Sequence, residues 1–200
     1  MKRNGTLRHD FTELNQGFIA LAVNGLEVGL APVVQERLAA LGERGARSLA
    51  RLPFALFGLG FEEEGAWTTL LSPCVQDLEP GYIAARAPAE RFTLLALSTL
   101  RTHLRLLPRA VSAWIGLPPA MRSRLATVEI GLLAPVAACA APRLRARRVL
   151  HEPVWLRLAD AAARRDRRQL ALLAAWGHQW SIRRSLGITT VTAGRHAFRR

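Results

Sequence analysis

The chain has 200 residues, half of them apolar, and carries 28 lysine and arginine residues against 15 aspartate and glutamate residues, a net charge of +13. This length and apolar content are enough to bury the core of one domain or two small ones, and they exclude disorder over most of the chain. The only cysteines, Cys74 and Cys139, exclude a disulfide framework and a zinc site built from cysteines, and we expect reduced thiols.

The charge is divided unevenly along the chain. Residues 1–90, the N-terminal half, carry eight basic and eleven acidic residues, whereas residues 91–200, the C-terminal half, carry twenty basic and four acidic ones. Every basic residue except Lys2 is an arginine, whose forked guanidinium matches phosphate geometry. A surface of this kind attracts polyanions, so we expect DNA as the partner. An acidic protein partner and a passive solvated surface are the alternatives.

The apolar residues of the N-terminal half follow helical spacing, and alternation of β-branched with polar residues is scarce. We therefore predict an all-α, multi-helical fold. The spacing predicts three helices here, over residues 11–24, 29–41 and 45–51. Gly42 stands where a left-handed cap ends a helix. Residues 1–71 are expected to form a smaller helical N-terminal region.

Three adjacent glutamates follow these helices: Glu62, Glu63 and Glu64. Consecutive helical residues point about 100° apart, so these carboxylates cannot converge on a metal ion. Acidic residues at a helix start complement the helix dipole. The run therefore indicates a solvated helix start.

Residues 72–88 contain three prolines and one glycine, and this composition predicts a linker. Beyond it we predict a basic helical domain over residues 89–186 and a basic tail over 187–200. The expected helices cover residues 90–107, 109–115, 118–126 and a stretch from Thr127 toward 138, with two more opened by Pro153 and by an Asp166 cap. Residues 143–148 follow a proline and are predicted to be extended.

No catalytic motif occurs in the sequence, and the five histidines are isolated from one another. We therefore expect no enzyme, no metal site and no cofactor. Charged residues interrupt the N-terminal apolar run, and the longest uncharged apolar stretch, residues 130–142, is shorter than the roughly 20 residues of a membrane helix. The expectation is a cytoplasmic protein without a membrane partner.

Two arginine groups are candidate DNA-binding residues. The first is Arg143, Arg145, Arg147 and Arg148, of which three could project from one side of an extended segment toward a phosphate backbone. The second is Arg164, Arg165, Arg167 and Arg168, at the junction of two helices. Arg167 and Arg168 lie in the first turn of the next helix, where a bound anion would offset the unfavourable dipole. Pairing with Asp160 and Asp166 is the alternative for this group.

The pair of short helices predicted between Met121 and Ala138 could form a helix-turn-helix. The second of them is apolar, however, and a recognition helix needs polar side chains toward the bases. Burial in a core or an interface is the better interpretation. The residues we assign to a dimer or partner interface are Trp114, Met121, Leu125, Ile130 and Leu133.

The same region carries a pattern of apolar residues with one glycine and one methionine: Ala110, Ile115-Gly116-Leu117, Met121, Leu125-Ala126, Val128, Ile130, Leu133, Val136-Ala137 and Arg147. Over about residues 92–182 this pattern resembles FlhD, a subunit of the bacterial flagellar master regulator. The resemblance implies an all-helical, dimerising subunit that binds promoter DNA together with FlhC. FlhC has a four-cysteine zinc site that this chain cannot build. The chain also departs from FlhD by its ninety preceding residues and by the absence of the cysteine that links FlhD subunits.

The sequence therefore predicts a DNA-binding transcriptional regulator that acts as a homodimer or with a helical partner subunit. The alternative is a non-enzymatic accessory subunit, for example of a secretion apparatus, whose basic half docks on an acidic partner. In that case Trp114, Trp155, Trp176 and Trp180 are candidate anchors. The helical spacing of Trp176 and Trp180 favours core packing instead.

Overall fold

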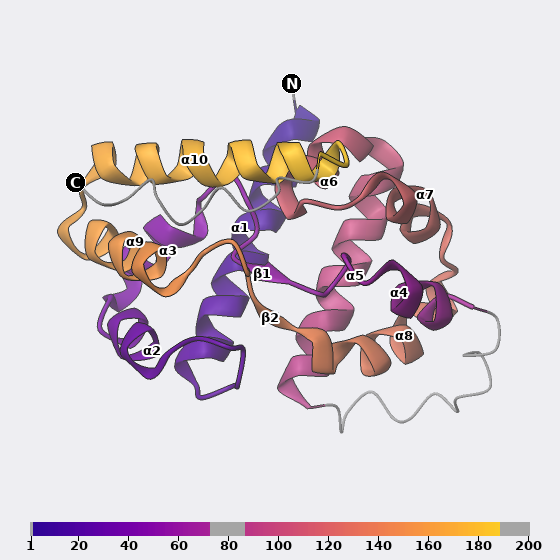
Figure 1. Ribbon diagram of the computed structural model, residues 1–200, viewed down its shortest axis with the longest axis horizontal. Coiled ribbons are helices and arrows are strands. Elements are labelled where there is room, and N and C mark those ends of the chain that lie inside the picture. Colours follow the sequence, from indigo (N-terminus) through magenta and orange to yellow (C-terminus); the bar gives the residue numbers. More distant parts are fainter. Residues whose placement is uncertain (1, 73–86, 189–200) are drawn as a thin grey trace.

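The computed structural model describes residues 2–72 and 87–188 (Figure 1). Helices dominate these ranges, and the only strands in them are two short ones that pair with each other. The predicted all-α class is therefore confirmed. The predicted linker falls mainly on residues 73–86 and the predicted tail mainly on residues 189–200, which lie outside the described residues.

The part of the N-terminal half before the gap forms four helices and one strand: α1 (Lys2–Val23), α2 (Pro32–Ala39), α3 (Gly42–Ala50), β1 (Phe57–Gly58) and α4 (Glu64–Leu70). The three predicted helices are present, although α1 starts nine residues earlier than expected and α2 starts only at its proline. Gly42 adopts the left-handed conformation expected for it, with φ of 61°.

The chain after the gap forms six α-helices, two 3-10 turns and one strand: α5 (Pro88–Leu106), α6 (Pro108–Ile115), α7 (Pro119–Thr127), η3 (Ile130–Leu132), α8 (Leu133–Ala140), η4 (Ala141–Arg143), β2 (Arg145–Ala146), α9 (Glu152–Arg164) and α10 (Arg167–Ser185). Proline stands at the first or second position of α5, α6, α7 and α9. Proline is favoured there because its missing N–H has no partner in the first turn and its φ already suits a helix.

The predicted helix from Thr127 toward residue 138 is wrong at its start. Thr127 is the last residue of α7, and its hydroxyl donates back to the carbonyls of Ser123 and Arg124 rather than capping a new helix. The following α-helix begins only at Leu133. Pro135 explains the difference, because its ring would clash with the carbonyl four residues earlier in a continuous helix but is tolerated in the first turn of α8.

The two strands join distant parts of the chain near the middle of the molecule (Figure 1). β1 and β2 pair antiparallel, with Phe57 opposite Ala146 and Gly58 opposite Arg145. Helices α2, α3 and α9 pack together at one end, and at the other end α7 and α8 pack against α5 while α4 packs against α8. Helix α10 packs across α6 and α9 along one edge.

An aromatic cluster lies where α1, β1, α5 and α6 meet. Phe11 stacks on Trp114 with ring centroids 3.9 Å apart, and Phe57 makes an edge contact with Phe92 at 5.0 Å. Phe18 contacts the rings of both Phe57 and Phe92. These residues belong to one hydrophobic core that contains residues from both halves of the chain. The predicted N-terminal region and the predicted basic helical domain therefore share a core.

Among the described residues, no individual helix has both the length and the apolar character needed to cross a bilayer. Two neighbouring segments, Pro119–Thr127 and Ile130–Arg143, meet that criterion only when taken together, and they are bent by 107° relative to each other.

Candidate functional site

A cleft of about 280 Å³ opens where β1 and β2 meet the end of α6 and the last turns of α10. Five arginines and two glutamates line it, which gives the cleft a net charge of +3: Arg143, Arg145, Arg147, Arg148, Arg184, Glu62 and Glu63. It thus contains the entire first predicted arginine group. The two carboxylates come from the N-terminal half and all five guanidinium groups come from the C-terminal half.

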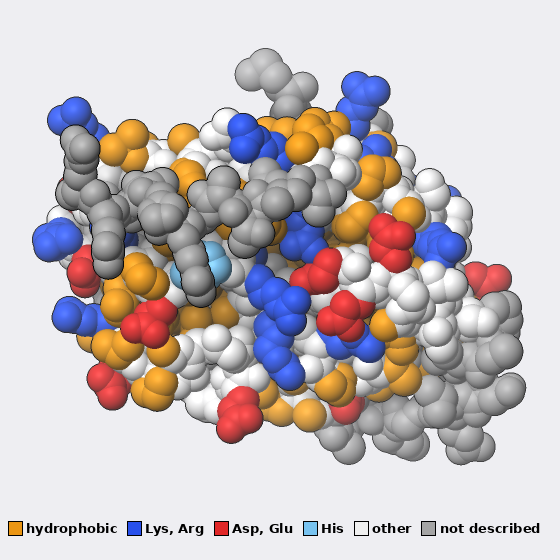
Figure 2. Space-filling view, viewed as in Figure 1, with side chains coloured by type: hydrophobic (Ala, Val, Ile, Leu, Met, Phe, Trp, Pro, Cys, Tyr) orange, Lys and Arg blue, Asp and Glu red, His pale blue; other side chains and the backbone are white. Residues whose placement is uncertain are grey.

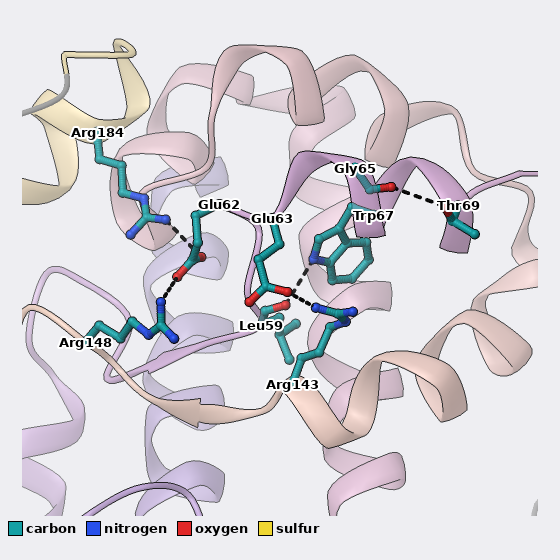
Figure 3. Close-up of polar contacts among 9 residues, drawn as sticks. All are labelled: Leu59, Glu62, Glu63, Gly65, Trp67, Thr69, Arg143, Arg148 and Arg184. Atoms are coloured by element: carbon teal, nitrogen blue, oxygen red, sulfur yellow. Dashed lines mark hydrogen bonds and ion pairs between the residues drawn. The ribbon is translucent and has the colours of Figure 1, made fainter.

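The glutamates pair with arginines across the cleft (Figure 3). Arg143 bonds to the carboxylate of Glu63. Glu62 lies between two arginines, 2.9 Å from a guanidinium nitrogen of Arg184 and 3.9 Å from one of Arg148. The sequence interpretation of the glutamate run as a solvated helix start fits Glu64, which alone occupies the first turn of α4.

Trp67 holds the segment that carries these glutamates. Its side chain is fully buried, and its indole Nε1 donates a hydrogen bond of 3.0 Å to the carbonyl of Leu59 (Figure 3). Phe61 packs against the indole ring, with centroids 4.7 Å apart. The segment from Leu59 to Glu63 is therefore fixed against α4, and this positions both carboxylates toward the arginines.

Arg147 is the one buried arginine of the group, with 5% of its surface exposed. Its Nη1 donates to the carbonyls of Ala55 and Trp114 at 2.8 and 3.1 Å, and its Nη2 donates to the hydroxyl of Ser181 at 2.8 Å. The guanidinium also lies 5.7 Å from the ring centroids of both Phe54 and Trp180. Planar guanidinium groups make such fork and stacking contacts well.

Burial and, to a smaller extent, the nearby Arg184 guanidinium lower the pKa of Arg147 to about 9, although Glu62 opposes both effects. The side chain therefore remains charged at neutral pH. Gly116 makes room for it: a Cβ at this left-handed position would lie 2.9 Å from Arg147 Nη2. The prediction that Arg147 contacts DNA phosphate needs correction, because its polar atoms are used inside the protein.

The other members of the first group reach the surface to different degrees. The side chain of Arg143 is 30% exposed and that of Arg148 is 77% exposed, and each has a glutamate partner. Arg145 is exposed and donates to the carbonyl of Leu144. The extended conformation predicted for residues 143–148 holds at Arg145 and Ala146, but the predicted projection of three arginines toward one external phosphate backbone does not occur.

The second predicted arginine group forms the turn between α9 and α10, and we call Arg164, Arg165, Arg167 and Arg168 the arginine turn. All four are exposed. Arg165 ends α9 in the left-handed conformation, with φ of 56°. The predicted cap is confirmed, because Asp166 accepts a hydrogen bond of 2.9 Å from the Gln169 amide.

The two acidic residues near this turn are engaged elsewhere. Asp166 caps α10, and Asp160 lies 3.6 Å from Arg37 of α2. Within the described part of the chain, none of the four arginines of the turn forms an ion pair with a carboxylate. The arginine turn therefore concentrates positive charge that no ion pair among the described residues neutralises.

Four of the five residues assigned to an interface lie inside the chain's own core. Trp114, Met121, Leu125 and Leu133 are each 5% exposed or less. Ile130 differs, because 73% of its surface is exposed at η3. Of the five residues, only Ile130 has an exposed side chain in this structure.

Several residues that shape the site have no local sequence signal. Arg184 pairs with Glu62 and stacks over Trp180 at 5.5 Å, although it lies outside both arginine groups. Asn15 of α1 is fully buried and fixes the segment before β1 through three hydrogen bonds. The opposite net charges of the two halves were the one sequence feature that indicated contacts between them. Asp10 and His103, whose side chains are 2.7 Å apart, form another contact between the halves.

No set of three or more histidine, cysteine, aspartate or glutamate side chains in residues 2–72 and 87–188 is placed to hold a metal ion. Comparisons with protein families, curated proteins and solved structures find no match to this chain. The resemblance to FlhD therefore rests on the sequence pattern alone.

Proposed function

We propose that this protein is a non-enzymatic, DNA-binding regulator that contacts DNA phosphates through the arginine turn. The observation that carries the proposal is the charge of this turn. Four guanidinium groups occupy five consecutive positions, all are exposed, and none is paired with a carboxylate of the described residues. Because these arginines have no carboxylate partner among the described residues, binding a phosphate breaks no ion pair there.

The position of the turn also suits a polyanion. Arg167 and Arg168 lie in the first turn of α10, where the helix dipole disfavours positive charge and favours an anion. Arg164 lies at the C-terminal end of α9, where its charge is favoured. A phosphate between the two helix ends would contact guanidinium groups from both. DNA supplies such phosphates at regular spacing along each strand.

The cleft at β1 and β2 has a different role in this proposal. Arg143, Arg148 and Arg184 are already paired with Glu62 or Glu63, and Arg147 is buried, so these four arginines contribute little to DNA affinity in the free protein. A regulator acting with a helical partner subunit, as the FlhD-like pattern implies, would use the arginine turn for phosphate contact and leave base recognition to other residues or to the partner. Phosphate contacts fix position on a duplex but carry no sequence information.

The test is a gel-shift titration of the purified chain with duplex DNA at several salt concentrations. We expect R164Q/R165Q/R167Q/R168Q to bind at least ten-fold more weakly and to show a smaller slope of log affinity against log salt, by about 0.9 for each phosphate that the variant no longer neutralises. The control is R44Q/R51Q/R105Q/R109Q, which removes the same charge from four exposed arginines elsewhere. An equal weakening in both variants, or no binding by the unaltered chain at low salt with or without a partner, refutes the proposal.

A further inference from the structure

Helix α10 exposes large apolar side chains on its solvent side. Its inner side packs closely: Gly177, Ser181 and Ser185 are buried, and a Cβ on Gly177 would lie 2.3 Å from the Phe54 ring. Its outer side carries Leu172, Ala175, Ile182 and Leu186, which we call the α10 stripe, and Gln179 lies in the same row between Ala175 and Ile182. Leu172 is 65% exposed, Ile182 37% and Leu186 63%.

The spacing of the α10 stripe places its residues in one row. Steps of three, seven and four residues keep side chains on the same face of a helix with 3.6 residues per turn. A surface helix normally directs polar side chains to solvent, so a row that exposes leucine and isoleucine side chains is a candidate contact surface. Of the nine large hydrophobic residues exposed in the described chain, four lie on α10 or within three residues of its end, so these side chains are concentrated here.

The charged residues of α10 indicate the kind of partner that would bind the α10 stripe. The helix contains Arg167, Arg168, Arg183 and Arg184 and no acidic residue. Arginines thus stand near both ends of the stripe, and Arg183 is exposed beside it. Figure 2 shows hydrophobic and basic side chains along the edge of the molecule that α10 forms in Figure 1.

The arginines of α10 argue against two possible binding partners of the α10 stripe, namely a second copy of this chain and residues 189–200 of the same chain. In a pair formed with α10 of a second copy, the arginines of one helix would approach the arginines of the other in either orientation, and like charges across an interface are unfavourable. Residues 189–200 of the same chain contain three arginines and no acidic side chain, so their charge is also unfavourable against α10.

We propose that the α10 stripe is the docking site for an amphipathic helix of a different protein, whose apolar face is flanked by acidic residues. Leu172, Ile182 and Leu186 would be the apolar contacts, and the arginines near each end would pair with the partner's carboxylates. The 19-residue helix is about 28 Å long, enough for a partner helix of five turns. Helix-in-groove recognition uses this same spacing of apolar anchors.

This inference concerns a surface different from the one that binds DNA in the proposed function. The two surfaces share Arg167 and Arg168 at the start of α10, and the stripe variants below leave both residues unchanged. Loss of DNA binding in the arginine-turn variant and loss of partner binding in the stripe variants are therefore separate results.

The test begins with photo-crosslinking in the cell of origin. The photoreactive amino acid p-benzoylphenylalanine replaces Leu172 or Leu186 in the full chain, and mass spectrometry identifies the crosslinked segment. The controls place the same probe at Leu95 and Leu106 of α5, which are 55% and 56% exposed. We expect a product specific to the α10 positions whose partner segment is an amphipathic helix flanked by Asp or Glu.

A synthetic peptide of that segment is then titrated against the purified full chain by fluorescence anisotropy. We expect L172S/L186S to weaken binding at least ten-fold and L95S/L106S to change it less than two-fold. Replacing the acidic residues of the peptide with their amides should also weaken binding at least ten-fold. Circular dichroism on each variant confirms that the helices are retained.

Six results overturn the proposal. The crosslinks can join α10 to a second copy, or to residues 189–200 of the same chain. They can match those of the α5 control positions or be absent altogether. Finally, the identified peptide can fail to bind, or can bind L172S/L186S as tightly as the unaltered chain.

Discussion

The guanidinium of Arg147 donates a hydrogen bond of 2.8 Å to the carbonyl oxygen of Ala55, a residue 92 positions earlier in the chain. The same side chain bonds to the carbonyl of Trp114 at the end of α6 and to Ser181 of α10. One buried arginine therefore connects β2, the segment before β1, and two helices. Its role in this structure is to hold the fold together.

We expect R147M to lower the free energy of unfolding by about 3 kcal/mol, because methionine fills much of the volume but leaves the buried carbonyl of Ala55 without its donor. Urea unfolding followed by circular dichroism measures the change. R148M is the matched control: its side chain is 77% exposed and its glutamate contact is 3.9 Å, so we expect at most about 1 kcal/mol. Equal stability of the two variants would contradict the assignment of Arg147.

Asn15 supports a second prediction of stability. Its amide nitrogen donates to the carbonyls of Ala50 and Phe54 at 3.1 and 3.0 Å, and its oxygen accepts from the amide of Leu56 at 2.9 Å. N15A leaves these buried backbone groups without those partners, and we expect a decrease of about 3 kcal/mol in the free energy of unfolding, measured with heat or urea. E13A, on the exposed side of α1, should change stability by less than about 0.5 kcal/mol. A decrease in N15A no larger than that in E13A would rule out this role.

Two helical glycines should respond in opposite directions to the same substitution. G177A places a Cβ 2.3 Å from the buried ring of Phe54, so we expect a destabilisation of about 1–3 kcal/mol. G65A meets nothing within 4 Å in α4 and should stabilise the protein by about 0.5–1 kcal/mol, because alanine restricts the unfolded chain. Melting temperatures of the two variants check the prediction, and a rise for G177A would show that α10 does not pack on Phe54 this closely.

The cleft glutamates offer a functional prediction that rests on the proposed DNA binding. E62Q/E63Q keeps the side-chain shapes but frees Arg143, Arg148 and Arg184 from their carboxylates. We expect tighter DNA binding in gel shifts and a steeper salt dependence, by about 0.9 for each additional phosphate that is neutralised. E64Q changes a neighbouring exposed glutamate in the first turn of α4 and adds half as much charge. An E62Q/E63Q effect no larger than twice that of E64Q would show that net charge alone is responsible.

The features that local chemistry determines were predictable from the sequence. Asp166 caps α10 because an aspartate before a helical run has an acceptor within reach of the third amide. Gly42 is left-handed, as its position between two helices indicated. The error at Thr127 has a local cause as well, since Pro135 prevents the helix from starting so early.

The features that depend on contacts between the two halves were not predictable in this way. Alternation along residues 143–148 describes the direction of side chains but not what lies on each side, so the burial of Arg147 among Phe54, Trp114 and Trp180 had no sequence signal. The partners of Glu62 and Glu63 are likewise about 80 or more residues away. Part of the charge difference between the halves is thus used within the molecule.

The pairing of β1 with β2 has a consequence for the order in which the protein is made. Helices α1 to α3 and strand β1 leave the ribosome before the strand and helices that cover them are synthesised. Until β2 and α10 emerge, Phe54 lacks its contacts with Arg147 and Gly177, and the carbonyl of Ala55 lacks its guanidinium donor. The nascent N-terminal half therefore keeps part of its apolar surface uncovered until α10 has been translated.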